Sequence, residues 1–223
     1  MATTCPICER RRGKRFCPGL SAGRWAKRGK GETICAQCCG EQRENTIDCP
    51  PHCSYLQAAH RYESERRSPP SAFAFPKVTI EESLLEEKQS LLAGLSLTIV
   101  RTAGEHSQLR DADVLAALDA LARSYQTRDS GLYFEQKPET AAAQALAAAV
   151  EEFLQQYSKE QQQRTGMSLR PGEALQALVF LRRLGDLEGN QRPLSGRYLQ
   201  FLRRTLPAAA VASDQRRLII PGT

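Results

Sequence analysis

The sequence lacks any apolar run long enough to cross a bilayer. No stretch of about 18 consecutive apolar residues occurs in the 223-residue chain, which excludes a transmembrane helix. The first residues also lack the basic segment and the apolar run of a secretory signal. With 41% hydrophobic and 25% charged residues, the composition is that of an ordinary soluble protein. We therefore expect a cytoplasmic location and no membrane association.

Histidine is scarce, and the motifs of common enzymes are missing. The chain has three histidines and contains no H-E-x-x-H zinc-protease motif, no phosphate-binding P-loop and no G-x-S-x-G nucleophile turn. Paired carboxylates such as Glu81 and Glu82 are adjacent in sequence rather than on one helix face, which is typical of a solvated surface. His106 lies in an expected loop without a Ser or Cys partner. We expect no enzymatic activity.

Cysteine is absent after residue 53, although eight cysteines occur between Cys5 and Cys53. A reducing cytosol disfavours structural disulfides, so such a cluster indicates metal ligands or redox groups. The charge divides at the same place. Residues 1–67 contain 13 Lys and Arg against 7 Asp and Glu, whereas residues 68–223 contain 18 of each. The sequence therefore predicts two parts of different character.

The spacing of the cysteines predicts zinc. Two C-x-x-C pairs and one C-x-x-x-C pair occur, and such pairs present two sulfurs to one tetrahedral ion from a tight turn. Eight thiolates suit two structural zinc ions, which would hold together a segment with too few large apolar residues for a core of its own. The preferred partition assigns Cys5, Cys8, Cys35 and Cys38 to one ion, and Cys17, Cys39, Cys49 and Cys53 to the other.

Alternatives to this ligand set stay open. Cys38 and Cys39 could exchange roles, and His52 or His60 could replace Cys17 or Cys39, although the sequence around both histidines favours an exposed position. Four thiolates also suit an iron–sulfur cluster, and a C-x-x-C pair can act as a thiol–disulfide redox sensor. No thioredoxin-like βαβ pattern surrounds the pairs, so we favour zinc.

The cysteines lie within unusual strings of residues. Together with Arg43, these strings are Phe16-Cys17-Pro18-Gly19-Leu20, Ile34-Cys35-Ala36-Gln37-Cys38-Cys39-Gly40 and Cys49-Pro50-Pro51-His52-Cys53-Ser54-Tyr55-Leu56. In them the chain resembles a group of uncharacterised bacterial cysteine-rich, zinc-finger-like proteins that share a CPxL…ICxxCCGxxR…CPxxCxYL signature. The resemblance covers about residues 5–56. It implies a metal-bound module and a bacterial origin, and it implies no activity.

The apolar pattern predicts a mainly α protein, with a small N-terminal two-zinc module followed by an all-α bundle of about five helices. We assign residues 1–62 to the cysteine-rich module, 63–78 to a linker, 79–207 to the helical domain and 208–223 to an irregular tail. The module should end in a short helix, Ser54–Glu65.

Five helix starts are expected in the helical domain. A capping box formed by Thr79 and Glu82 should open the first helix. Asp111 should cap the second, and Pro138 should be the first residue of the third. A short extended piece is expected at Leu132-Tyr133-Phe134. The fourth helix should run from near Pro171 to about Leu187, and the fifth from Ser195 to before Pro207.

Basic side chains are concentrated between residues 10 and 30, with Phe16 and Trp25 interleaved. Residues 1–30 contain nine Lys and Arg, all within this range, against one acidic residue, Glu9. Basic groups neutralise phosphates, and aromatic rings stack on unpaired bases. This basic stripe therefore predicts contact with RNA or a ribonucleoprotein. A protein-interaction adaptor stays open as the alternative, because a charge run is also typical of a solvated surface. The residues assigned to nucleic-acid contact are Arg10, Arg11, Arg12, Lys14, Arg15, Arg24, Trp25, Lys27 and Arg28.

Overall fold

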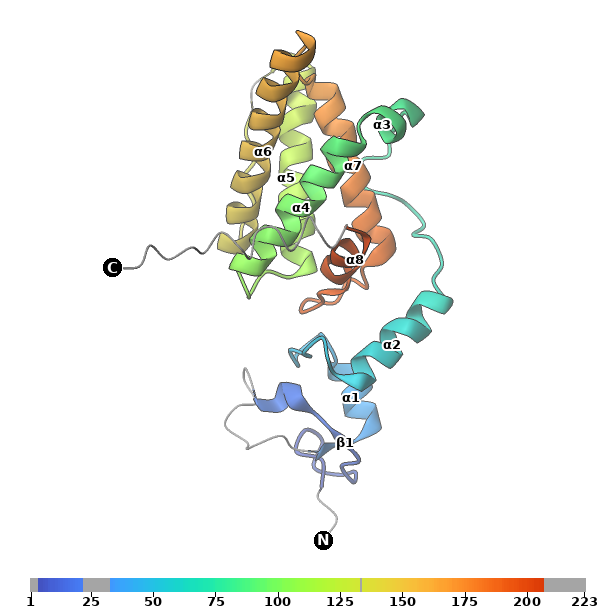
Figure 1. Ribbon diagram of the computed structural model, residues 1–223. Helices are drawn as coiled ribbons and strands as arrows, with labels where there is room; N and C mark the ends of the chain where they lie inside the picture. The colour runs from blue at the N-terminus through green and yellow to red at the C-terminus, as the bar shows by residue number, and fades with distance from the viewer. Residues whose placement is uncertain (1–3, 22–32, 133, 207–223) are drawn as a thin grey trace, which may run out of the picture. The chain divides into compact units, whose positions relative to one another are not determined.

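The computed structural model describes residues 4–21, 33–132 and 134–206 (Figure 1). Eight α-helices dominate these ranges, together with one 3-10 helix and one two-stranded sheet. The mainly helical fold is therefore confirmed. Within the same ranges, no helix has the length and apolarity needed to span a bilayer. The predicted tail, 208–223, lies outside the described residues.

The chain divides into two compact units. The N-terminal unit combines residues 1–69 with a distant segment, Asn190–Gly196. The helical unit combines Pro70–Gly189 with the chain after Gly196. The first unit is therefore discontinuous in sequence, because the segment between α7 and α8 of the helical unit belongs to it.

The N-terminal unit has little regular structure. Its strands β1, Arg15–Phe16, and β2, Thr33–Ile34, pair antiparallel, with Arg15 opposite Ile34. A 3-10 helix, Pro18–Ser21, follows β1, and the two α-helices are α1, Ala36–Gln42, and α2, Ser54–Glu65. The bounds of α2 are those predicted from the sequence.

The core of this unit is small. Its large aliphatic members are Leu20, Ile34 and Ile47, which pack with buried cysteines. A side chain at Gly19 could not be accommodated, because a Cβ there would lie 2.6 Å from Cγ2 of Ile47. The buried apolar residues in the described part of this unit are few for its size, and small units of this kind often depend on cross-links or bound metal for stability.

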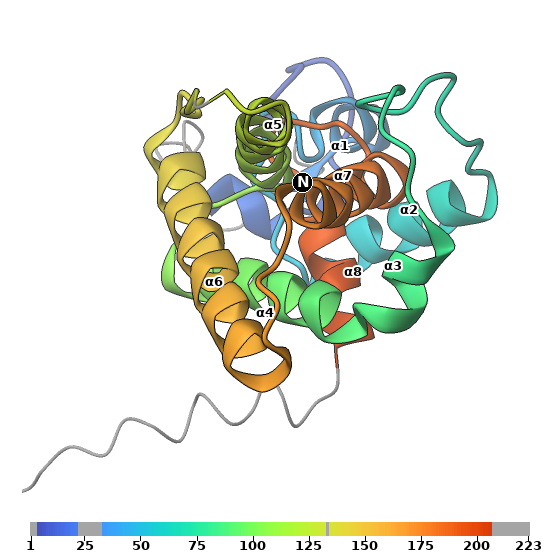
Figure 2. The same ribbon diagram turned by 90° about the horizontal axis from the view of Figure 1, so that it is seen from above.

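The helical unit has six helices around one core. They are α3, Glu82–Glu87; α4, Gln89–Glu105; α5, Asp111–Asp129; α6, Ala141–Thr165; α7, Pro171–Glu188; and α8, Arg197–Thr205. In Figures 1 and 2, α5 lies between α6 and α7, and α4 crosses them. The apolar stripes predicted for these helices supply the core, which includes Leu95, Leu118, Leu146 and Leu178.

The α7 start at Pro171 agrees with the prediction, but the starts of α3 and α6 do not. The predicted Thr79 capping box is wrong, since Glu81 precedes α3 and its N–H donates to Oε1 of Gln176 at 3.1 Å. Pro138 does not begin α6. Thr140 caps that helix instead, accepting from the Ala143 N–H at 3.1 Å. At α3 a long-range hydrogen bond to Gln176 is made near the expected cap, whereas at α6 a local cap by Thr140 starts the helix three residues after Pro138.

Asp111 caps a helix other than its own. It is the first residue of α5, and its buried carboxylate accepts from the N–H groups of Tyr198 and Leu199, at 2.9 and 3.1 Å. These amides belong to the first turn of α8, which therefore begins two residues after the predicted Ser195. Leu132 and Phe134 belong to no strand, and Tyr133 lies outside the described residues.

Candidate metal centre

Cys5 and Cys8 are presented by a tight turn. An antiparallel bridge joins Thr4 to Arg12 across the base of this turn. The Cys5 N–H donates to the Arg11 carbonyl at 2.8 Å, and the Glu9 N–H donates to the Cys5 carbonyl at 2.8 Å. Glu9 adopts a left-handed conformation, with φ of 55°, which few non-glycine residues do. The turn places both sulfurs of the C-x-x-C pair on one side.

Cys35 and Cys38 are presented by the first turn of α1. Cys35 is the N-cap residue, and its sulfur accepts from the Cys38 N–H at 3.4 Å. The preceding residue, Ile34, ends β2. A cysteine turn, a β-hairpin and a helix thus follow one another, in a treble-clef-like order. The helix that supplies two of the four cysteines is α1, with Cys35 as its N-cap residue and Cys38 in its first turn.

The two pairs converge on one point. The sulfurs of Cys5, Cys8, Cys35 and Cys38 all lie within 4.8 Å of one another, and those of Cys8 and Cys35 are 4.0 Å apart. A tetrahedral ion with metal–sulfur bonds of about 2.3 Å separates its sulfurs by about 3.8 Å. These four cysteines can therefore hold one metal ion. Within the described ranges, no other group of His, Cys, Asp and Glu side chains is gathered as closely.

The electrostatics of this cluster favour a cation. Hydrogen bonds from the backbone N–H groups of Arg10 and Arg11 lower the pKa of Cys8 to about 6. Burial raises the pKa of Cys38, and interactions with the sulfurs of Cys35 and Cys8 raise it further. A bound divalent cation removes this penalty and deprotonates its thiol ligands. Cys8 therefore ionises more readily than Cys38, whose thiolate would gain more from a nearby cation.

The other four cysteines are arranged more loosely. Burial raises the pKa of Cys17, and the charges of Cys39 and Cys53 add to the effect. Burial also raises the pKa of Cys49 to about 12, with contributions from Cys17 and Cys53. These thiols are near enough to sense one another's charge. They do not form a group as compact as the first cluster.

Neither histidine near the cysteines joins the compact cluster. His52 is exposed, as expected. His60 is not, because only 13% of its side chain is accessible and its Nε2 lies 2.9 Å from Oε2 of Glu44. The prediction of an exposed His60 is therefore wrong, because His60 pairs with the buried carboxylate of Glu44, whose burial no local pattern indicates.

Glu44 joins distant parts of the sequence. Its side chain is 2% exposed, and its φ of 53° is left-handed. Besides His60, its Oε2 accepts from Nδ2 of Asn190 at 2.8 Å, and its carbonyl accepts from the Leu194 N–H at 2.8 Å. Burial alone would raise the pKa of Glu44, but His60, Asn190 and the charge of Arg192 together lower it. The carboxylate is therefore held ionised inside the unit.

Arg192 reinforces the same attachment. Its Nη1 donates to the carbonyls of Arg43, at 2.6 Å, and Gly40, at 3.3 Å, which lie at the end of α1 where helical carbonyls lack partners. Its Nη2 is 3.9 Å from a carboxylate oxygen of Glu63. Sequence patterns could not have identified these residues, because Arg192 and Arg43 are 149 positions apart.

The basic stripe divides into several groups. Arg24, Trp25, Lys27 and Arg28 lie outside the described residues. Arg10, Arg12 and Lys14 are exposed. Arg11 lies beside the compact cysteine cluster, and Arg15 lies over an aromatic ring.

Arg11 lies next to the compact cysteine cluster. Its guanidinium donates to Oε1 of Gln37 on α1. Interaction with the Cys8 sulfur raises the pKa of Arg11, with further contributions from Cys35. Arg15 instead lies over Tyr55, with its Cζ 4.8 Å from the ring centroid. Next to it, Phe16 is 59% exposed.

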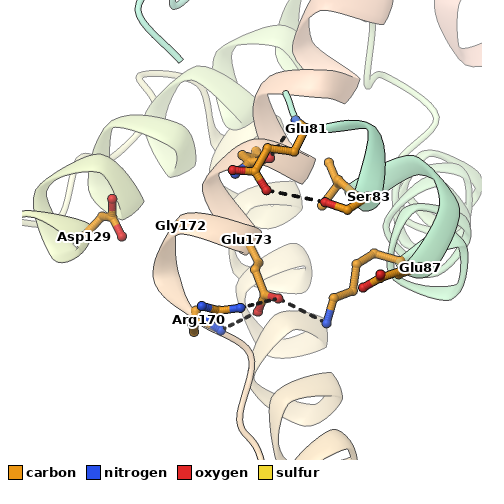
Figure 3. Close-up of a pocket in the computed structure, with 10 residues that line it drawn as sticks. Glu81, Ser83, Glu87, Asp129, Arg170, Gly172 and Glu173 are labelled. Carbon is orange, nitrogen blue, oxygen red and sulfur yellow. Dashed lines mark hydrogen bonds and ion pairs between the residues drawn. The ribbon is translucent and has the colours of Figure 1, made fainter. Parts of the chain in front are cut away.

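The helical unit has a small polar pocket of about 260 Å³ where α3, α5 and α7 meet. Figure 3 shows Glu173 at the centre of its contacts, joined to Arg170 and to a lysine side chain. Glu173 lies 3.2 Å from Nζ of Lys88 and accepts from the Arg170 N–H at 2.9 Å. These contacts fix the start of α7, so we interpret the pocket as part of a helix cap.

A scan against protein-family models, a search of curated proteins and a search of solved structures found no match to the chain.

Proposed function

We propose that the N-terminal unit is a zinc-stabilised binding module that contacts nucleic acid and catalyses no reaction. The observation that carries this proposal is the convergence of Cys5, Cys8, Cys35 and Cys38 within 4.8 Å. Four cysteine ligands fill a tetrahedral shell, so no position remains for the water or substrate that catalytic zinc requires. A second zinc bound by Cys17, Cys39, Cys49 and Cys53 would complete the module.

A single ion suits the compact cluster better than an iron–sulfur cluster does. The thiolates of a multi-iron cluster bind different iron atoms, whereas these sulfurs are close enough to share one. Buried sulfurs around a small apolar core also favour a structural role. Zinc is the ion that proteins most often bind with four cysteines in such sites.

Metal content tests this part of the proposal. We expect two zinc ions per chain by elemental analysis of protein purified under reducing conditions without added metal. Cys35→Ser should lose the ion of the compact cluster and unfold much of the N-terminal unit, while the helical unit keeps its circular dichroism. Ala36→Ser, at the adjacent exposed position, is the matched control and should keep both ions. Full zinc content in Cys35→Ser would reject the ligand set.

The nucleic-acid part of the proposal is supported by exposed basic side chains close in sequence to the compact cysteine cluster. With two zinc ions and eight thiolates, the excess of +6 in residues 1–67 falls to about +2. The remaining attraction for phosphate must therefore be local. Arg10, Arg12 and Lys14 supply it, and exposed Phe16 on β1 adds an aromatic surface.

The salt dependence of binding tests this surface. Replacing Arg10, Arg12 and Lys14 by alanine should weaken RNA binding and flatten the slope of log K against log salt by up to about 2, because each lost phosphate contact contributes about 0.7 for single strands. The control replaces three exposed basic residues of the helical unit, Arg123, Lys159 and Arg164. Equal slopes for both triple variants would reject the stripe as the contact surface.

A groove in the helical unit favours a second candidate function, docking of a protein partner. It has a volume of about 1030 Å³ and lies between α5, α6 and residues 135–138, with both apolar and charged side chains. If the protein holds two zinc ions per chain but binds no RNA measurably, docking of a protein partner becomes the leading function.

A further inference from the structure

We propose that one face of α2 is a stacking surface for single-stranded nucleic acid, on which Tyr55 and Tyr62 contact unpaired bases. The proposal rests on the nucleic-acid function proposed above and specifies the form of the strand. It adds contact residues outside the basic stripe.

The two tyrosines share one face of the helix. They are seven residues apart, which is within about 20° of two full turns, and their Cα atoms are separated by about 10.5 Å along the axis. Tyr55 is 36% exposed and Tyr62 is 57% exposed. The buried residue of α2 is Leu56, so neither tyrosine belongs to the core of the unit.

An arginine guanidinium lies over each tyrosine ring. Cζ of Arg15 lies 4.8 Å from the Tyr55 centroid, and Cζ of Arg66 lies 3.9 Å from the Tyr62 centroid. A guanidinium stacked on a ring keeps its N–H groups at its edge, where they can donate to a phosphate. In each tyrosine–arginine pair, the ring can therefore stack on a base and the guanidinium can bind the phosphate of the same nucleotide.

The charge of the helix is suited to a polyanion. Glu63 lies near two arginines of its own unit, with its Oε1 4.0 Å from Nη1 of Arg43 and 3.9 Å from Nη2 of Arg192. The exposed Glu65 is offset by exposed Arg61 and Arg66. Phosphates approaching the tyrosine face therefore meet a net positive surface.

The exposed rings favour a single strand over a duplex. Both faces of a base in a duplex are covered by its neighbours, whereas unpaired bases can stack on aromatic side chains. A separation of about 10.5 Å corresponds to about three steps at the stacked spacing of about 3.4 Å per nucleotide. A strand of about four nucleotides can therefore reach both tyrosines.

Fluorescence anisotropy with a labelled oligouridine of about eight nucleotides tests the proposal, with a duplex of the same length as competitor. Tyr62→Leu should weaken binding about 5- to 150-fold, the range measured for losing one base stack, and Tyr55→Leu should act in the same direction. Tyr62→Phe retains the ring and should bind within about twofold of the wild type. Phe134→Leu removes an exposed ring of the helical unit, 61% accessible, and should leave affinity unchanged.

The outcomes separate this proposal from the one it rests on. Unchanged affinity in both leucine variants, or equal affinity of the wild type for single strand and duplex, would overturn the stacking surface. If the triple Arg10, Arg12 and Lys14 variant still weakens binding in that case, the proposed function survives. A wild-type protein that binds neither oligonucleotide at low salt would reject both. Zinc content measured on each variant distinguishes lost stacking from a lost fold, and Arg66→Gln gives a second variant in which weaker binding is expected.

Discussion

Arg11 has a role that its neighbours in the basic stripe do not share. A zinc ion with four thiolates carries a net charge of −2, and the Arg11 guanidinium interacts with two of those sulfurs. Its contact with Gln37 also links the cysteine turn to α1. Arg11 is therefore placed to stabilise a metal held by these cysteines, whereas exposed Arg10 and Arg12 are available to a partner.

Arg11→Gln should accordingly release zinc more readily. We expect transfer to a colorimetric chelator to be about 10-fold faster or more, as is usual for residues that support metal ligands. Arg12→Gln is the matched control, with the same change in charge one residue away, and should release zinc at the wild-type rate. Equal release rates in the two variants would show that Arg11 has no specific role in holding the metal.

Among the elements, α7 depends on an ionised carboxylate at its start. Burial alone would raise the pKa of Glu173, but the Arg170 N–H and Lys88 together lower it below its usual 4.5. Because the folded-state pKa is lowered, the stabilisation is fully present above pH 4.5 and is lost as the pH falls through the folded-state value.

Glu173→Gln should therefore lower the free energy of unfolding at pH 7 by about 0.5 kcal/mol, the contribution typical of an ion pair near the surface. The difference from the wild type should shrink steadily as the pH falls below 4.5. Urea denaturation at several pH values measures this. Glu152→Gln, at an exposed position of α6, is the control. A difference that grows at acid pH would contradict the assigned ionisation.

The elements also show which local signals could be trusted. Pro171 marked the start of α7, and the cysteine spacing predicted the compact cluster, because both depend on residues close in sequence or on metal chemistry. The caps predicted at Thr79 and Asp111 are wrong, because Glu81 bonds to a distant glutamine and Asp111 caps α8. A local capping rule fails wherever a tertiary partner competes for the same donor or carboxylate.

In the molecule as a whole, two arginines anchor distant segments. Arg192 donates to carbonyls at the end of α1 within the N-terminal unit. Arg183 does the same in the helical unit, where it donates to the carbonyls of Ala74, Phe75 and Val78. Neither attachment could be predicted from the sequence, because no local pattern identifies an arginine that donates to carbonyls more than a hundred positions away.

Arg192→Ala should loosen the N-terminal unit, at a cost of about 1–3 kcal/mol for its lost charged hydrogen bonds. We expect faster zinc loss to a chelator and faster proteolysis within residues 33–69. Arg183→Ala should leave zinc loss unchanged and lower the thermal stability of the helical unit. Identical zinc kinetics in the two variants would show that Asn190–Gly196 does not stabilise the N-terminal unit.

The discontinuity of the N-terminal unit sets an order of events during synthesis. A nascent chain that has emerged through residue 69 already carries all eight thiols, but Asn190, Arg192 and Leu194 have not yet been translated. At about 5–20 residues per second, the ribosome needs roughly 6–25 s to supply them. On the proposed zinc function, the cysteines depend on metal capture alone during that interval. We therefore expect zinc supply at the time of translation to affect the yield of correctly assembled protein.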